Sequence, residues 1–218
     1  MATRLDPKAL RVYVVTTGTL VPGLDHRVIA AAAIEGGATA IQLRAPELSD
    51  AELVAVATDL ATTCRGAGVL FVVNDRIDVA VAARAAGVHL GQGDTPADAR
   101  AALGPDRVLG ISVADPGQAR VAEAAGADYL GVTVWSTATK PEAVGEGLAG
   151  VTAVADATGL PVVGIGGIDV RNAAQVIGAG AAGVAVISAV AASPDPVAAT
   201  RQLRELVDGT TDRSGGTA

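Results

Sequence analysis

The chain has 218 residues and a net charge of −7, and 50% of its residues are hydrophobic. With 18% charged residues, this composition excludes a disordered chain and a coiled coil. The acidic charge and the few aromatic residues argue against a nucleic-acid partner, and the apolar runs are too short to cross a bilayer.

The first residues and the single cysteine indicate the cellular compartment of the protein. Residues 1–10 are polar and lack the apolar stretch of a signal peptide. Cys64 lies in a helical pattern and has no cysteine to pair with, so it is expected to be a small core residue rather than a reactive thiol. We expect a cytoplasmic protein without a membrane partner. The sequence does not fix the oligomeric state and is compatible with a homo-oligomer.

Apolar runs and helical patterns alternate along the whole chain. The predicted strands lie at residues 12–16, 40–43, 69–73, 88–90, 108–111, 129–132, 161–164 and 183–187. The helical patterns that follow them lie at residues 25–34, 50–65, 77–85, 97–103, 118–125, 147–157, 170–177 and 196–207. Glycines between a helix and the next strand, as in Gly178-Ala179-Gly180, supply the left-handed residue that ends a helix.

This alternation predicts the fold class. Solidly apolar strands suit a parallel sheet that is covered by helices, and eight such units predict a single (β/α)8 TIM barrel over residues 1–208. The alternative is an open doubly wound sheet, which requires a Gly-x-Gly-x-x-Gly turn that Thr16-Thr17-Gly18-Thr19-Leu20 lacks. Residues 209–218 are rich in Gly, Thr and Ser and are predicted to be a disordered tail.

Polar or glycine residues take over where the predicted strands end. In a barrel of parallel strands these ends converge on one rim, which is where such enzymes place their active sites. The rim would combine carboxylates for a metal, cations for phosphate, and glycines where a backbone can approach a ligand. This pattern predicts an enzyme that acts on small phosphorylated substrates.

The ends of the last two predicted strands suggest a phosphate site. Gly166 and Gly167 follow the seventh strand, and Ser188 follows the eighth. The loops after these two strands of a barrel commonly bind phosphate, because glycines let backbone amides approach it. The alternative is that the two glycines only make a tight turn.

Two aspartates suggest a metal site. Asp75 and Asp94 follow neighbouring predicted strands, where two carboxylates would repel each other unless a cation lies between them. Oxygen ligands of this kind suit Mg²⁺, which also takes oxygens from a substrate phosphate. The alternative is two ordinary loop aspartates, of which Asp94 caps the following helix.

A glutamine and an arginine share one face of the second predicted strand. Gln42 and Arg44 are two residues apart, so both would face the barrel interior near its mouth. An arginine there needs an anionic partner, and a phosphate or diphosphate can bind it bidentately. The alternative partner is an interior carboxylate.

Other polar residues near the rim are open to two interpretations. Thr137, Thr139 and Lys140 are either an anion clamp or a solvated loop. His26 and His89 are expected to be structural or solvated rather than catalytic. Trp135 would either form an apolar wall for an aromatic ligand or pack the loop. The sequence leaves the alternatives for all of these residues open.

Taken together, these residues resemble the thiamine-phosphate synthase family over nearly the whole chain. The resemblance rests on Gln42-Leu43-Arg44, Val73-Asn74-Asp75, His89-Leu90-Gly91-Gln92-Gly93-Asp94, Gly110-Ile111-Ser112, Thr137-Ala138-Thr139-Lys140, Gly164-Ile165-Gly166-Gly167-Ile168 and Ile187-Ser188. Each motif is weak alone, but their order and spacing are specific. The resemblance implies an enzyme that joins hydroxymethylpyrimidine diphosphate to thiazole phosphate and releases diphosphate.

The resemblance also implies roles for individual residues. Asp75 and Asp94 would ligate Mg²⁺. The pyrimidine diphosphate would be held by Gln42, Arg44, Asn74, Ser112 and Lys140, of which Arg44, Ser112 and Lys140 are the catalytic candidates. The thiazole phosphate would be held by Thr137, Thr139, Gly167, Ile187 and Ser188.

Two departures from the family pattern leave room for a slower enzyme or another substrate. The family usually has a lysine two residues after the arginine, where this chain has Pro46. The loop before Thr137 is one residue shorter than usual and lacks two prolines. A thiazole tautomerase-like enzyme and a non-catalytic barrel that binds thiamine precursors are the competing interpretations. Asp75, Asp94 and Lys140 argue against the first, and Pro46 favours the second.

Overall fold

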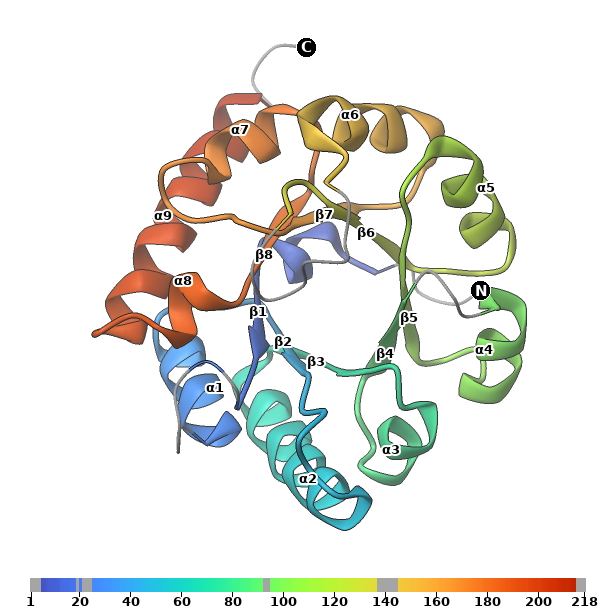
Figure 1. Cartoon of the computed structure of the whole chain (residues 1–218), viewed down its shortest axis with the longest axis vertical. Helices are drawn as coiled ribbons and strands as arrows, with labels where there is room; N and C mark the ends of the chain where they lie inside the picture. The colour runs from blue at the N-terminus through green and yellow to red at the C-terminus, as the bar shows by residue number, and fades with distance from the viewer. Residues whose placement is uncertain (1–4, 19, 21–24, 92–94, 137–144, 215–218) are drawn as a thin grey trace.

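The computed structural model describes residues 5–18, 20, 25–91, 95–136 and 145–214, and its strands close into one parallel barrel (Figure 1). In pairing order the strands are β1 (Val12–Thr16), β2 (Ala40–Leu43), β3 (Leu70–Asn74), β4 (Gly87–Leu90), β5 (Val108–Ser112), β6 (Tyr129–Thr133), β7 (Val162–Ile165) and β8 (Gly183–Val186). Pairing of β8 with β1 closes the ring. The predicted (β/α)8 barrel is confirmed.

Helices surround the barrel on its outside (Figure 1). They are α1 (His26–Glu35), α2 (Asp50–Ala67), α3 (Ile77–Ala82), α4 (Pro96–Leu103), α5 (Pro116–Ala124), α6 (Gly147–Ala157), α7 (Ala173–Gly178), α8 (Ser188–Ala191) and α9 (Pro196–Ser214). The short α8 and the 3-10 helix η1 (Pro7–Leu10) were not predicted from the sequence. Among the described residues, no helix is long and apolar enough to cross a membrane.

Two apolar clusters stabilise the barrel. The larger lies between the strands and the helices, and the smaller fills the barrel itself. Because successive strand residues face opposite sides of the sheet, every strand except β4 contributes to both clusters. In β1, for example, Val12 and Val14 belong to the outer cluster, whereas Tyr13 and Val15 belong to the inner one.

The N-terminal segment closes the floor of the barrel. Leu10 of η1 is fully buried in the inner cluster, and Leu5 packs against the same cluster. The chain can pass this close to β8 because residue 183 is glycine: a Cβ there would lie 1.8 Å from the carbonyl oxygen of Leu10. With the floor filled, the opposite mouth of the barrel is left for a ligand.

The last helix is longer than the sequence predicts. α9 continues to Ser214, so the prediction of a disordered tail is wrong for residues 209–214, and residues 215–218 lie outside the described part. The hydroxyls of Thr210 and Thr211 donate to the carbonyls of Leu206 and Val207, four residues earlier, at 2.8 and 3.0 Å. Threonine hydroxyls that bond to the preceding turn in this way are accommodated within a helix, although these threonines suggest a loop in the sequence.

The position of Cys64 makes its thiol inert. Cys64 is fully buried in α2 within the outer cluster, as predicted, and burial raises the pKa of the thiol to about 12. We expect no reaction with a disulfide reagent such as DTNB at mildly alkaline pH while the protein is folded, because the thiolate is the reactive form. Denaturant should release one thiol per chain. Reaction of the native protein at the rate of a free thiol would contradict this.

Candidate active site

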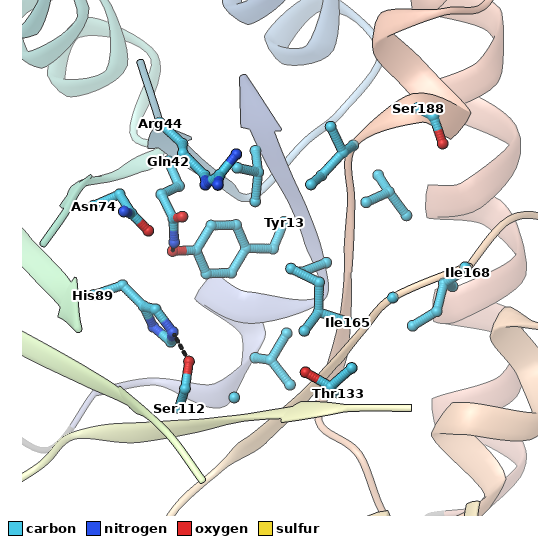
Figure 2. A pocket seen from close by; sticks show the side chains of 18 of the residues that line it. Tyr13, Gln42, Arg44, Asn74, His89, Ser112, Thr133, Ile165, Ile168 and Ser188 are labelled. Atoms are coloured by element: carbon cyan, nitrogen blue, oxygen red, sulfur yellow. Dashed lines mark hydrogen bonds between the residues drawn. The ribbon is translucent and has the colours of Figure 1, made fainter. Parts of the chain in front are cut away.

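A cavity opens among the carboxyl ends of the strands, at the mouth opposite the filled floor. Every strand, from β1 to β8, supplies at least one residue to its lining. Figure 2 shows Gln42, Arg44 and Asn74 on one side and Ile168 and Ser188 on the other. Residues that are far apart in the sequence are therefore brought around one opening.

Gln42 lies in β2 and Arg44 directly follows the last residue of this strand, and both line the cavity. The Gln42 side chain is buried, and its Nε2 donates a hydrogen bond to the hydroxyl of Tyr13 at 2.7 Å. Arg44 is half-buried and forms no ion pair with any carboxylate that the structure describes. Among the described residues, Arg44 therefore has no interior carboxylate as its partner. Its guanidinium is available to bind an anionic ligand.

A buried histidine fixes the loop that carries Arg44. His26, at the start of α1, is hydrogen-bonded through Nδ1 to the hydroxyl of Thr16 at 2.8 Å and through Nε2 to Glu47 Oε1 at 2.7 Å. His26 therefore has a structural position, which was one of the two alternatives for it. Glu47 fits here because residue 18 is glycine, where a Cβ would lie 2.2 Å from its Oε1.

The end of β3 turns sharply at Asp75. Asn74 lines the cavity, and its Nδ2 donates to Asp75 Oδ2 at 2.6 Å. Asp75 is exposed and has a φ of 60°, a left-handed conformation that costs a non-glycine residue roughly 1–2 kcal/mol. Its backbone N–H donates to the carbonyl of His89 in β4 at 2.9 Å. These bonds hold a carboxylate beside the end of β4, the strand that precedes Asp94.

The predicted metal site cannot be assembled within the described residues. Asp94 lies outside them, so its distance from Asp75 stays a prediction. In the part of the chain that the structure describes, no group of three or more His, Cys, Asp or Glu side chains is placed to hold a metal ion. Asp75 forms no ion pair with a described Lys or Arg, so its carboxylate is not neutralised by them.

The ends of β7 and β8 form the opposite wall. Gly166 and Gly167 line the cavity with φ values of 99° and 64°, and Ile187 and Ser188 line it beside them. A Cβ on Gly166 would lie 2.4 Å from the backbone oxygen of Trp135, so that position needs glycine for space as well as for its backbone. The two glycines make a tight turn, and that turn faces the cavity.

The loop between β6 and α6 is described at residues 134–136 and 145–146 only. Thr137, Thr139 and Lys140 therefore lie outside the described residues. Trp135 packs against the outer apolar cluster and is not part of the cavity lining. Of its two alternatives, packing of the loop is the one that the structure supports.

A set of hydrogen-bonded side chains inside the cavity was missed from the sequence. The hydroxyls of Tyr13 and Tyr129 are 3.0 Å apart, and His89 bonds through Nδ1 to Tyr129 at 2.9 Å and through Nε2 to Ser112 Oγ at 3.0 Å. His89 is thus a structural residue within the site. The chain has two tyrosines, and both lie in predicted strands at inward-facing positions, which was the available signal.

Comparisons with known proteins point to one family. The family described as thiamine monophosphate synthase matches residues 12–190. A thiamine-phosphate synthase from Moorella thermoacetica is 49% identical over 198 residues, or 89% of this chain and 94% of that protein. One from Natronomonas pharaonis is 49% identical over 203 residues, or 91% and 95%. A solved thiamine phosphate pyrophosphorylase from Pyrococcus furiosus has a TM-score of 0.86 and 38% identity, covering 94% of this chain and 98% of that chain.

Proposed function

Because the chain belongs to the thiamine monophosphate synthase family and is an enzyme of thiamine biosynthesis, we propose its substrates and the groups that act on them. The enzyme joins 4-amino-5-hydroxymethyl-2-methylpyrimidine diphosphate to 4-methyl-5-(2-phosphoethyl)thiazole. The products are thiamine phosphate and diphosphate. The observation that carries the proposal is a cavity lined by both Arg44 and the turn at Gly166 and Gly167. Figure 2 shows Arg44 across the cavity from Ile168 and Ser188, which leaves two separate places for anions.

The pyrimidine diphosphate lies on the side of β2 to β5. Gln42, Asn74 and Ser112 line this side and offer hydrogen bonds to the ring, and Arg44 binds the diphosphate. Lys140 completes the set by resemblance to the family. The bond between the methylene carbon and the diphosphate oxygen breaks, and its electron pair leaves with diphosphate. Arg44 and Lys140 stabilise the negative charge that grows on the leaving group.

The thiazole phosphate lies on the side of β7 and β8. The turn at Gly167, with Ile187 and Ser188, holds the phosphate tail, and Thr137 and Thr139 complete this set by resemblance. With its tail fixed, the thiazole nitrogen is held against the pyrimidine methylene carbon and donates its lone pair to it. Positioning supplies much of the acceleration, and no protein nucleophile takes part.

The residues at the end of β3 fit a magnesium ion. Asp75 offers carboxylate oxygens, is exposed to solvent at the rim, and is oriented by Asn74. With Asp94 it would hold Mg²⁺, whose remaining ligands would be water and diphosphate oxygens. The ion, when bound, would reduce the charge on the departing diphosphate.

The proposal is tested by mixing the purified protein with both precursors and Mg²⁺. We expect thiamine phosphate and diphosphate to form in equal amounts. Conversion of the thiazole alone would favour the tautomerase-like alternative, and binding of precursors without turnover would favour a non-catalytic barrel; either result would overturn the proposal.

Pro46 suggests that the diphosphate site lacks one cation. The residue is exposed and two positions beyond Arg44, and the adjacent Glu47 is engaged by His26. Pro46→Lys is expected to lower KM for the pyrimidine diphosphate by roughly two- to fivefold, the effect of one exposed ion pair. Pro46→Ala controls for the changed backbone and should leave KM unchanged. Equal KM values for the lysine and alanine variants would show that no diphosphate charge lies within reach.

A further inference from the structure

A continuous chain of hydrogen bonds crosses the barrel interior and joins two lining residues of the proposed pyrimidine site. It runs from Gln42 through Tyr13, Tyr129 and His89 to Ser112, with successive separations of 2.7, 3.0, 2.9 and 3.0 Å. Each residue comes from a different strand: β2, β1, β6, β4 and β5. Figure 2 shows Gln42 and Ser112 at the cavity, with Tyr13 and His89 between them.

The direction of this chain follows from its donors. Gln42 Nε2 can only donate, so the Tyr13 hydroxyl accepts from it and uses its own single proton toward Tyr129. Tyr129 then donates to His89 Nδ1, which must carry a lone pair. A neutral His89 therefore bears its proton on Nε2 and donates it to Ser112 Oγ. The proton of the Ser112 hydroxyl is left to point toward a ligand.

Both phenols keep the single proton that this direction requires. Tyr13 and Tyr129 are fully buried, and burial raises the pKa of each phenol well above its usual value. Neither phenol therefore ionises at a pH at which the enzyme works, and each hydroxyl keeps a proton that it can donate. With one proton per hydroxyl, reversing one bond reverses every bond in the chain.

Glycines in the neighbouring strands make room for the hydrogen-bonded side chains. A Cβ on Gly110 in β5 would lie 2.1 Å from Cζ of Tyr129, and one on Gly131 in β6 would lie 3.0 Å from Cε1 of His89. The rest of the inner cluster is apolar, including Val15, so a pair of phenylalanines would fill the same space and would lack only the hydrogen bonds that the tyrosine hydroxyls form with each other, with Gln42 and with His89. Packing alone therefore gives no reason for the hydroxyls.

Building on the proposed function, we propose that Tyr13, Tyr129 and His89 are positioning residues that set the hydrogen-bond polarity of the pyrimidine site. His89 donates to Ser112, so the Ser112 hydroxyl is held as a donor toward the ligand. Tyr13 accepts from Nε2 of the Gln42 amide, so Oε1 of Gln42 is left as an acceptor for the ligand. A ligand that fits must donate to Gln42 and accept from Ser112. An aminopyrimidine diphosphate has both, since its exocyclic amine donates and its ring nitrogens and diphosphate oxygens accept.

The direction of the hydrogen bonds from Gln42 to Ser112 is tested first by ¹⁵N NMR of the ligand-free protein with labelled histidine. His89 in the wild type is expected to be the neutral tautomer with the proton on Nε2. Tyr129→Phe removes the donor to Nδ1 and should shift His89 toward a mixture of tautomers. The other histidine, His26, is bonded to Thr16 and Glu47 and provides an internal reference that should not move. A wild-type His89 protonated on Nδ1, or a tautomer unchanged by Tyr129→Phe, would overturn the proposal.

The consequence for the ligand is tested by kinetics and binding. Tyr129→Phe is expected to raise KM for the pyrimidine diphosphate about tenfold, as for one lost hydrogen bond to a polar ligand, and to leave KM for the thiazole phosphate unchanged. Equal changes in both KM values would indicate a general loss of structure instead and would overturn the proposed role.

Tyr13→Phe provides a second variant that retains the aromatic ring. It frees the Gln42 amide to rotate, so the preference for the 4-amino pyrimidine diphosphate over its 4-oxo analogue should fall about tenfold in competition binding. An unchanged preference would overturn the proposal. The NMR result needs neither substrate nor turnover, so failure of the proposed function would appear separately, as a wild type that forms no thiamine phosphate.

Discussion

Asp75→Ala is expected to lower kcat/KM for the condensation by roughly a thousandfold, because a metal ion contributes several kcal/mol of charge stabilisation. The exposed Asp75 carboxylate is held beside the end of β4 by Asn74 and by a backbone bond to His89. Its left-handed backbone would be relieved by glycine, so Asp75→Gly should be as inactive as Asp75→Ala while folding at least as well. Steady-state kinetics and thermal unfolding of both variants measure this.

The matched control is Asp78→Ala. Asp78 is an exposed carboxylate only three residues further along, and it is paired with Arg76 at 2.8 Å. Its loss should leave kcat/KM within a factor of about two, as for exposed ion pairs of small energy. EDTA should abolish wild-type activity, and added Mg²⁺ should restore it. Full activity of Asp75→Ala, or activity that persists in EDTA, would exclude the proposed metal role.

Arg44→Met is expected to lower kcat by roughly 10²–10³-fold, the usual cost of removing one group that stabilises developing charge. The Arg44 side chain lines the cavity, and no described carboxylate neutralises it. Methionine keeps much of the apolar stem, so the loss reports the guanidinium rather than the packing. Arg44→Lys should recover part of the rate, because a lysine keeps the charge but loses bidentate geometry.

An exposed arginine on α1 provides the control for charge. Arg27 pairs with Asp59 at 2.7 Å on the outside of the barrel, away from the cavity lining. Arg27→Met removes one positive charge from the chain without changing the site, so its kcat should equal that of the wild type. A similar loss in both variants would mean that the overall charge, and not the position of Arg44, controls the rate.

Local patterns predicted the strands and their ends well for a physical reason. Strands buried on both faces are apolar runs with sharp polar ends, so β1 and β2 were located to the residue and the remaining strands to within a few residues. The short η1 and α8 lack enough residues for a helical period, and α9 was ended too early because Gly209, Thr210 and Thr211 resemble a loop.

The polar chain inside the barrel depends on contacts that no local pattern contains. His89, Ser112 and Tyr129 meet because the register places Gly110 beside both His89 and Tyr129, and Ser112 beside Gly131. That register follows from the closure of the whole sheet, and a one-residue slip would turn each side chain to the opposite face. Sequence reasoning could place each residue on a strand, but it could not show that their hydroxyls and ring nitrogens meet.

The most direct test of the central idea is a crystal structure of the protein grown with Mn²⁺ and diphosphate, with the anomalous signal used to locate the metal. We expect one Mn²⁺ bound by carboxylate oxygens of both Asp75 and Asp94, with the diphosphate between it and the guanidinium of Arg44. Mn²⁺ bound elsewhere, or the two carboxylates too far apart to share it, would exclude the proposed metal site.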